Sequence, residues 1–354
     1  MPTDTEKNLS QLTVYIEENL RAARKKGVHF VDPRHLKDRV LTRQNHIIFG
    51  RRGAGKTTLL SAITQTKKDF ITIYINLEDA KDTPIADTLI RILTVALSEL
   101  RRTVKEQTPW FNAGAWRLRR KIEKQKEALD KLGEKEAGEK LAALQQNIEQ
   151  YKDLFRATPQ MLGHKAIYLA LDDFYFVPHT LQPDLLDYVH RLTKDTDLYL
   201  KVASVKDRST LYRAEAETYR GVELGHDAHE IDIDYTMEKF AEMENFLHEL
   251  LEAANQESGA AVKIDTYFKE DGFRQLCLAS EGVPRNFLSL FVKIANRHKD
   301  DPFAQPFIGK DEIADETGIK ITEPPVKQKS LIQRFITYIK TRLAKLSPRK
   351  PAKS

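Results

Sequence analysis

One stretch, His46 to Leu60, constrains this chain more than any other. Its sequence, HIIFGRRGAGKTTLL, has glycines and a Lys-Thr pair at the P-loop spacing G-x-x-x-x-G-K-[ST]. Glycines let the backbone turn so that consecutive N–H groups point at one anion. The apolar run before the loop predicts a buried strand. The residues after it predict a helix whose N-terminus faces phosphate. The stretch therefore predicts a strand–loop–helix unit that binds a nucleotide.

The residue types in the loop predict separate roles. Lys56 is expected to reach the β- and γ-phosphates, and the Thr57 hydroxyl is expected to ligate Mg²⁺. The residues expected to contact the nucleotide are Gly50, Arg51, Arg52, Gly53, Ala54, Gly55, Lys56, Thr57 and Thr58. Phe30 and Val31, which precede the strand, are candidates to cover the base, although plain packing explains them as well.

A second chemical signature lies in Ala166 to Pro178, AIYLALDDFYFVP, where an apolar run ends in two carboxylates. This is the form of a Walker B strand. Asp172 is expected to hold Mg²⁺, usually through water, and Asp173 to orient or deprotonate the attacking water. An Asp-Asp pair ends many ordinary strands, so this pair indicates a Walker B strand only because a P-loop precedes it in the sequence.

Three more stretches predict strands: the apolar runs 69–77 and 198–205, and 229–235, where polar and apolar residues alternate. The first is expected to be buried on both faces of the sheet. The second ends near the expected γ-phosphate, where Ser204 suits a phosphate or water contact and Arg208 an electrostatic role. Helical patterns follow Pro84 and cover 236–254.

Residues 117–155 differ in kind, because a narrow apolar seam runs there among many Lys, Glu and Gln. Gly133 and Gly138 interrupt it, which predicts an antiparallel, coiled-coil-like hairpin that projects from the body. The hairpin is either a spacer that shields one face of the sheet or an arm that recognises a protein partner or a second copy. Both interpretations remain open.

Charge is distributed unevenly along the 354 residues, which carry a formal net charge of +5. From Lys327 to Ser354 there are nine Lys or Arg and no acid, and 329–346 has the pattern of a basic amphipathic helix. This tail suits docking on the body or a protein partner, non-specific DNA, or an anionic membrane surface. The single cysteine, Cys277, excludes an internal disulfide and is expected to be buried. Without an apolar leader or membrane-length run, a soluble cytoplasmic protein is predicted.

Taken together, these motifs resemble those of the AAA+ and STAND P-loop ATPases, nearest to the origin-recognition, initiator-type ATPases and their bacterial relatives. The resemblance covers about residues 28–300 and rests on FGRRGAGKTT, ALDDFYFVP, LYLKVASV and EGVPRNF. It implies an α/β fold with a five-stranded parallel sheet in the order 5-1-4-3-2, followed by an all-helical lid. It also implies ATP and Mg²⁺ as cofactors. By this analogy Ser204 stands at sensor 1, Arg285 at sensor 2, and Pro284 at the nucleotide-contacting proline.

The expected organisation is an N-terminal helix (1–27), an ATPase core (28–235) with a helical-hairpin insertion (110–158), a lid (236–308), and a linker with the basic tail (309–354). Three departures from the family stand out. Walker B carries Asp172-Asp173 instead of Asp-Glu, which points to slow hydrolysis. After the lid there is no winged-helix pattern, and no arginine finger can be assigned.

Three functions compete at this point. The first is an ATP-driven conformational switch with slow Mg²⁺-dependent hydrolysis, coupled to a partner. The second is a DNA-binding, initiator-like protein in which ATP controls contact through the basic tail. The third is a metabolic phosphotransferase, which the sequence disfavours because no second substrate signature accompanies the P-loop.

Overall fold

A computed structural model of the chain describes residues 4–20, 31–65, 70–163, 166–215, 218–269, 271–300 and 308–317. Phe30 and the basic tail over 327–354 therefore lie outside the described residues. Within the described part, no helix combines the length and apolar character needed to cross a membrane.

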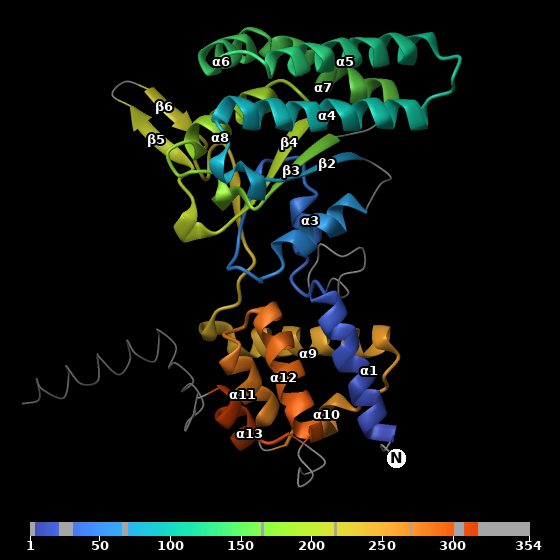
Figure 1. Ribbon diagram of the computed structural model, residues 1–354, viewed down its shortest axis with the longest axis vertical. Coiled ribbons are helices and arrows are strands. Elements are labelled where there is room, and N and C mark those ends of the chain that lie inside the picture. The colour runs from blue at the N-terminus through green and yellow to red at the C-terminus, as the bar shows by residue number, and fades with distance from the viewer. Residues whose placement is uncertain are drawn as a thin grey trace, which may run out of the picture.

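A five-stranded parallel sheet forms the centre of the larger half of the molecule (Figure 1). Its strands stand in the order β2-β3-β4-β1-β7, which confirms the predicted order 5-1-4-3-2 because β7 is the fifth strand of this sheet. The sheet strands are β1 (His46–Phe49), β2 (Phe70–Asn76), β3 (Ala166–Asp172), β4 (Leu198–Ser204) and β7 (His229–Asp232). An antiparallel pair outside the sheet, β5 (Tyr212–Glu215) and β6 (Thr218–Gly221), was not predicted, since both strands are short and largely polar.

Strand β2 corrects one expectation, because it is not buried on both faces. Ile71, Ile73 and Ile75 are buried against the helices on one side, whereas Thr72 is half-buried and Tyr74 is exposed on the other. The physical reason is position: β2 is the edge strand, and β3, which is buried throughout, separates it from the middle of the sheet. An edge strand keeps the period-2 alternation that a central strand can lose.

Helices cover both faces of the sheet (Figure 1). One face carries the long helix α4, which begins directly after Pro84 as predicted, together with α8. The other face carries α2 and α3, and their apolar residues pack on the central strands. The helices of this half are α2 (Leu36–Val40), α3 (Lys56–Thr64), α4 (Ile85–Gln107), α5 (Ala113–Leu132), α6 (Ala137–Gln146), α7 (Ile148–Leu162) and α8 (Gln182–Thr193).

The inserted helices differ from the predicted projecting hairpin. The chain does turn back after Gly133, but the returning arm is divided into α6 and α7 at Asn147. Ile122, Leu144 and Phe155 are fully buried in the same apolar cluster as the sheet and α4. The insertion is thus a further helical layer laid over α4. Burying the apolar residues of the insertion against α4 removes more apolar surface from water than pairing its two arms with each other alone would.

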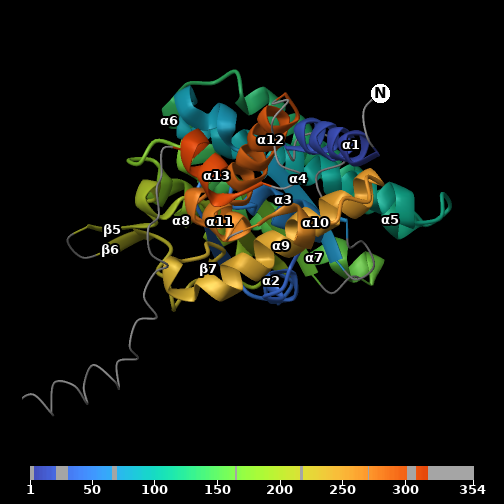
Figure 2. The same ribbon diagram turned by 90° about the horizontal axis from the view of Figure 1, so that it is seen from below.

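A separate helical module follows β7 and includes the N-terminal helix α1 (Asp4–Asn19) (Figure 2). Leu9, Leu12 and Ile16 of α1 are buried in one apolar cluster with the later helices, so α1 and the helices between residues 240 and 317 build this module together. Cys277 is buried there, as predicted. The later helices are α9 (Phe240–Ser258), α10 (Ile264–Tyr267), α11 (Gly272–Ala279), α12 (Pro284–Asp300) and α13 (Lys310–Thr317).

A fully buried lysine ties β4 to the segment that enters β1. Lys201 Nζ donates to the carbonyls of Thr42 (2.8 Å) and Gln44 (2.7 Å) and lies 2.9 Å from His46 Nδ1. Burial lowers the pKa of Lys201 to about 6, and burial together with the neighbouring Lys201 lowers the pKa of His46 to about 3. At neutral pH both groups are therefore largely uncharged, which suits a site with no carboxylate partner for Lys201 among the described residues.

We expect Lys201 to make stability rise with pH. Its folded pKa lies below the ordinary lysine value of about 10.4, so between these values the unfolded chain binds the extra proton and unfolding becomes harder as pH rises. The melting temperature should increase between about pH 6.5 and 8, a window above the titration of His46, and Lys201→Met should abolish that increase. Exposed Lys124→Met is the matched control. Equal pH slopes for the wild type and Lys201→Met would contradict this assignment.

Candidate functional site

The P-loop lies at the carboxyl end of β1 and leads directly into α3. Gly55, the residue before α3, has φ +103°, a conformation that side-chain-bearing residues rarely adopt. Gly53 has φ +90°, and a Cβ built there would stand only 2.9 Å from Cβ of Arg285. Gly55, a glycine of the motif, is thus required by the turn itself, whereas Gly53, at a variable position of the motif, is required both by its positive φ and by the close approach of α12.

Lys56 lies inside this loop and is buried. Its Nζ donates to the carbonyls of Gly50 (2.6 Å) and Arg51 (3.0 Å). Burial lowers the pKa of Lys56, while the carboxylates of Asp172 and Asp173 oppose that shift. An ammonium held between loop carbonyls and two nearby carboxylates is placed to meet an anion that enters the loop.

The two acidic residues after β3 occupy different environments. Asp172 is fully buried, and its carboxylate accepts hydrogen bonds from the Tyr74 hydroxyl (2.8 Å) and from Thr57. Burial and the adjacent Asp173 raise the pKa of Asp172, and these hydrogen bonds partly counter that effect. Asp173 has φ 55°, and its Oδ2 accepts from Asn76 Nδ2 at 3.2 Å. The sharp turn sends the two carboxylates to different surroundings.

A cavity of about 940 Å³ opens beside these groups. The predicted residues that line it are Arg52, Gly53, Lys56, Thr57, Asp173 and Arg285. Glu17 of α1 and Ser289 of α12 also line it, so both parts of the molecule contribute walls. The cavity therefore has cations at the loop and on α12, and carboxylates from Asp173 at the end of β3, Glu17 and Glu18 of α1, and Glu78 after β2.

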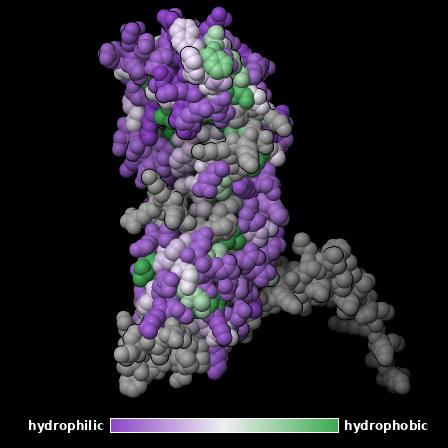
Figure 3. All heavy atoms as spheres, turned by 90° about the vertical axis from the view of Figure 1, so that its right-hand side faces the viewer, coloured by the Kyte–Doolittle hydropathy of each residue, from purple (hydrophilic) through white to green (hydrophobic). Residues whose placement is uncertain are grey.

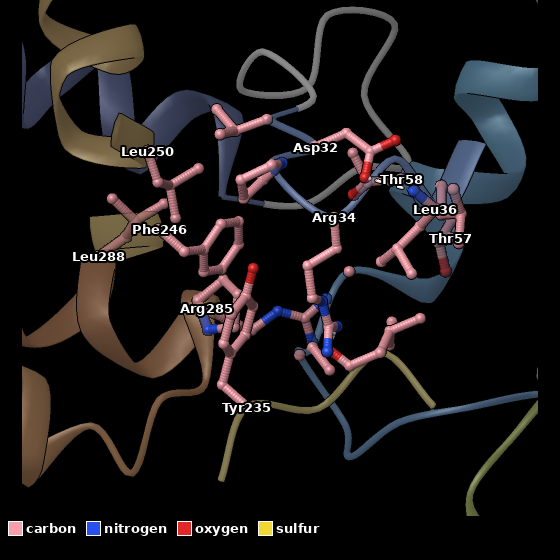
Figure 4. A pocket seen from close by; sticks show the side chains of 18 of the residues that line it. Asp32, Arg34, Leu36, Thr57, Thr58, Tyr235, Phe246, Leu250, Arg285 and Leu288 are labelled. Atoms are coloured by element: carbon pink, nitrogen blue, oxygen red, sulfur yellow. Dashed lines mark hydrogen bonds between the residues drawn. The ribbon is translucent and has the colours of Figure 1, made fainter. Parts of the chain in front are cut away.

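A smaller cavity of about 130 Å³ lies between the segment before α2, the start of α3 and the helical module (Figure 4). Tyr235 stacks on Phe246 with ring centroids 4.6 Å apart and planes 12° from parallel. The Arg34 guanidinium lies 4.3 Å from the centroid of the Tyr235 ring. Predicted residues that line this cavity are Val31, Gly53, Ala54, Gly55, Thr57, Thr58, Pro284 and Arg285. An apolar, aromatic cavity that continues from a P-loop has the character of a base-binding site.

Three contacts join the P-loop to the helical module. The backbone N–H of Arg285 donates to the Gly53 carbonyl (3.3 Å). The Arg51 guanidinium donates to the Glu281 carbonyl (2.7 Å) and lies 3.4 Å from the Glu281 carboxylate. Arg285, as predicted from the sequence, stands at the first turn of α12 and faces both cavities.

Five of the predicted residues line neither cavity: Gly50, Arg51, Asp172, Ser204 and Arg208. Ser204 is fully buried, its Oγ is 2.5 Å from Ser209 Oγ, and its carbonyl accepts from the Gly50 N–H. Arg208 follows in a short 3₁₀ turn, and its carbonyl accepts from Gln182 Nε2. Neither residue lines either cavity. Ser204 thus lies beside the P-loop, but its side chain is engaged with Ser209.

Sequence reasoning missed several polar residues of the site, among them three that bond predicted residues. Tyr74 and Asn76 of β2 bond the carboxylates of Asp172 and Asp173, and Asp234 accepts the Arg51 N–H at 2.9 Å. Asn76 pairs in register with Asp172. The sequence feature that could have identified these residues is their position, since polar residues that end parallel strands gather at one edge of the sheet.

Two residues of this site, Thr57 and Asp172, are the candidate ligands of a metal ion. The part of the chain that the structure describes contains no cluster of three or more His, Cys, Asp or Glu that could enclose a metal ion. A hydroxyl and a carboxylate, as in Thr57 and Asp172, instead match the oxygen ligands with which Mg²⁺ binds beside phosphate. Asp172 is buried and its pKa is raised, so a neighbouring cation would stabilise its charged form.

Comparison with known proteins gives no family assignment from sequence. No family model matches the chain, and no curated protein matches it. Among solved structures it is similar to an arginine-to-alanine variant of RuvB from Thermotoga maritima. That match has 12% identity and a TM-score of 0.37, over 96% of this chain and 78% of that chain. The P-loop NTPase fold therefore rests on the sheet order and the P-loop geometry described above.

Proposed function

We propose that this chain binds ATP with Mg²⁺ between the P-loop and the helical module, hydrolyses it slowly, and acts as a nucleotide-driven switch. The observation that carries the proposal is the larger cavity, where Lys56, Thr57, Asp173 and Arg285 converge from three separate segments. A phosphate group in the cavity would meet the P-loop amides and two cations.

In this proposal Thr57 and Asp172 hold Mg²⁺, which supplies charge neutralisation at the phosphates when bound. Asp173 orients or deprotonates the attacking water. The position of Asp173 supports this role, since Asp173 lines the cavity whereas Asp172 is buried behind Thr57. Its side chain is shorter than the glutamate of most AAA+ proteins, which supports slow turnover.

The nucleotide would control the position of the helical module through α12. Arg285 reaches the cavity and its backbone contacts Gly53, so a γ-phosphate would add an attraction between the two parts. Gly282-Val283-Pro284-Arg285 at this junction supports the AAA+/STAND assignment, with Arg285 as sensor 2 and Pro284 against the nucleotide. A partner that responds to this change is also part of the proposal. It would bind through residues 117–155, or it would be a second copy of the chain.

The test is equilibrium binding of ATP and ADP to the full chain, followed by phosphate release, each with and without Mg²⁺ and duplex DNA. Tight ATP binding with slow Mg²⁺-dependent release is the expected result. Failure of ATP to bind would contradict the proposal. Turnover that rises with duplex DNA would favour the initiator-like alternative, in which the tail contacts DNA.

Removing the Arg285 side chain should weaken the binding of ATP but not the binding of ADP. We expect Arg285→Ala to weaken ATP binding by about 10-fold or more, because one hydrogen bond to a charged group contributes about 1.5–3 kcal/mol. ADP affinity should change little, since the contact is proposed for the γ-phosphate. Calorimetric titration measures both, and Arg297→Ala on the same helix is the control, since Arg297 pairs with Glu316 away from the cavity. Equal losses for ATP and ADP would contradict the role.

A further inference from the structure

The turn between α4 and α5 and the first turn of α5 together present three exposed aromatic side chains. Trp110 is 88% exposed, Phe111 71% and Trp116 52%. Trp110 and Phe111 stand edge to face with ring centroids 5.8 Å apart. Figure 3 shows apolar side chains near the top of the face that contains this end of the helical layer, on a surface that is otherwise mainly hydrophilic. Large aromatic rings left in water at one place are a mark of an interaction surface.

The same segment is strongly basic. Residues 101–121 contain seven Lys or Arg and one acid. Two of these cations are paired: Arg101 with Glu123, and Arg102 with Glu99 and Glu106. Among the described residues, Lys105, Arg117 and Arg120 have no carboxylate within ion-pair distance. The surface thus keeps several cations available for an anion.

A groove between α4 and α5 brings Trp116 together with several of these cations. Its volume is about 360 Å³ and its lining consists of Arg101, Lys105, Trp116, Arg119, Arg120 and Glu123. The Arg120 guanidinium lies 5.4 Å from the centroid of the Trp116 ring. The Arg119 Nε is buried and has no hydrogen-bond partner in the described part of the chain. The only carboxylate in the groove, Glu123, is held by Arg101.

We propose that this groove, together with Trp110 and Phe111 on the turn that joins α4 to α5, binds single-stranded nucleic acid. Exposed aromatic rings beside a line of cations provide what such a ligand needs, namely faces for base stacking and charges for phosphates. A duplex fits less well, because its bases already stack on one another. A membrane fits less well too, since a planar surface cannot enter the groove in which Trp116, Arg119 and Arg120 lie.

The residues of this site belong neither to the proposed ATP site nor to the basic tail. Its residues lie on α4, α5 and their connection, and none of them lines the two cavities at the P-loop. Failure of ATP binding and failure of this inference are therefore distinguishable by experiment.

The chain carries its own probe for the test. It contains two tryptophans, and both belong to this surface. Titrating the full chain with an oligothymidylate of about 20 nucleotides, a length that exceeds one typical single-strand site, should quench the tryptophan fluorescence. A duplex of equal length should quench it much less. Raising the salt concentration should weaken binding, because phosphate contacts release counterions.

Substitutions localise the effect. Trp116→Ala should weaken oligothymidylate binding by roughly 5- to 150-fold, the range given by about 1–3 kcal/mol per stacked base. Trp116→Phe should keep most of the affinity, since a ring remains. Arg120→Gln should reduce the dependence of affinity on salt. Tyr219→Ala removes an exposed ring on β6 and serves as the control, with unchanged binding.

Several results would overturn the inference. One is oligothymidylate binding that survives Trp116→Ala without loss, which would assign the contact to another segment such as the tail. Another is equal quenching by duplex. A third is absence of quenching by oligothymidylate while phosphatidylserine vesicles shift the tryptophan emission to shorter wavelength, which would assign the surface to a membrane.

Discussion

Lys56→Ala is expected to lower ATP affinity by about 100-fold or more. The ammonium is held by two loop carbonyls and lines the cavity where phosphate would enter. Each hydrogen bond to a charged group contributes about 1.5–3 kcal/mol, so losing contacts to two phosphates is sufficient for such a change. The measurement is calorimetric titration of ATP with Mg²⁺ into the full chain.

Two further variants make this result specific. Lys56→Met keeps the aliphatic stem and removes the charge, so it should lose ATP binding to a similar degree while preserving the packing around the stem. Lys81→Ala removes an exposed lysine outside both cavities and should leave ATP affinity unchanged. ATP affinity that stays at the wild-type value in both Lys56 variants would contradict the proposed nucleotide site.

Asp173→Asn is expected to reduce ATP turnover by about 100-fold or more while ATP affinity changes by less than about 3-fold. A positioned general base contributes about 10² to 10⁴ in rate, and the amide cannot accept a proton as the carboxylate does. The substitution keeps the size of the side chain, and the Asn76 amide remains opposite it. Phosphate release at saturating ATP, together with a binding titration, separates the two effects.

Asp172→Asn provides the contrast, because the two carboxylates are given different roles. Asp172 lies behind Thr57 and is proposed to hold Mg²⁺, so its loss should weaken Mg²⁺-dependent ATP binding itself. Asp173→Ala should behave like Asp173→Asn, keeping ATP and losing turnover. Wild-type turnover in either Asp173 variant would remove that residue from the proposed mechanism.

Much of the fold was predictable because it depends on local patterns. The P-loop spacing, the apolar run before Asp172 and the helix after Pro84 each specify an element within a few residues of sequence. The strand order followed from the family resemblance, and the sheet confirms it. The antiparallel pair β5–β6 and the division of the insertion at Asn147 escaped prediction, since neither carries a strong periodic signal.

The candidate site was predictable only in part. The larger cavity is lined by Arg52, Gly53, Lys56 and Thr57 of the P-loop, by Asp173, and by Arg285 of α12, all of which were named from the sequence. Tyr74, Asn76 and Asp234 could not be singled out, because each acquires its role from a neighbour that is distant in sequence. Ser204 shows the converse case: its strand position was right, yet a nearby hydroxyl engages its side chain.

The sequence by itself determined the chemistry available to this protein. A glycine loop with Lys56 and Thr57, and a strand ending in Asp172, are local arrangements whose spacing already dictates backbone conformation and charge. Tertiary structure alone decided which groups meet across the chain. It brought α1 onto the C-terminal helices, laid the insertion over α4, and left the tryptophans exposed beside arginines. The physical reason is that burial of apolar surface depends on the shape of all elements together, whereas turns and caps depend on their own residues.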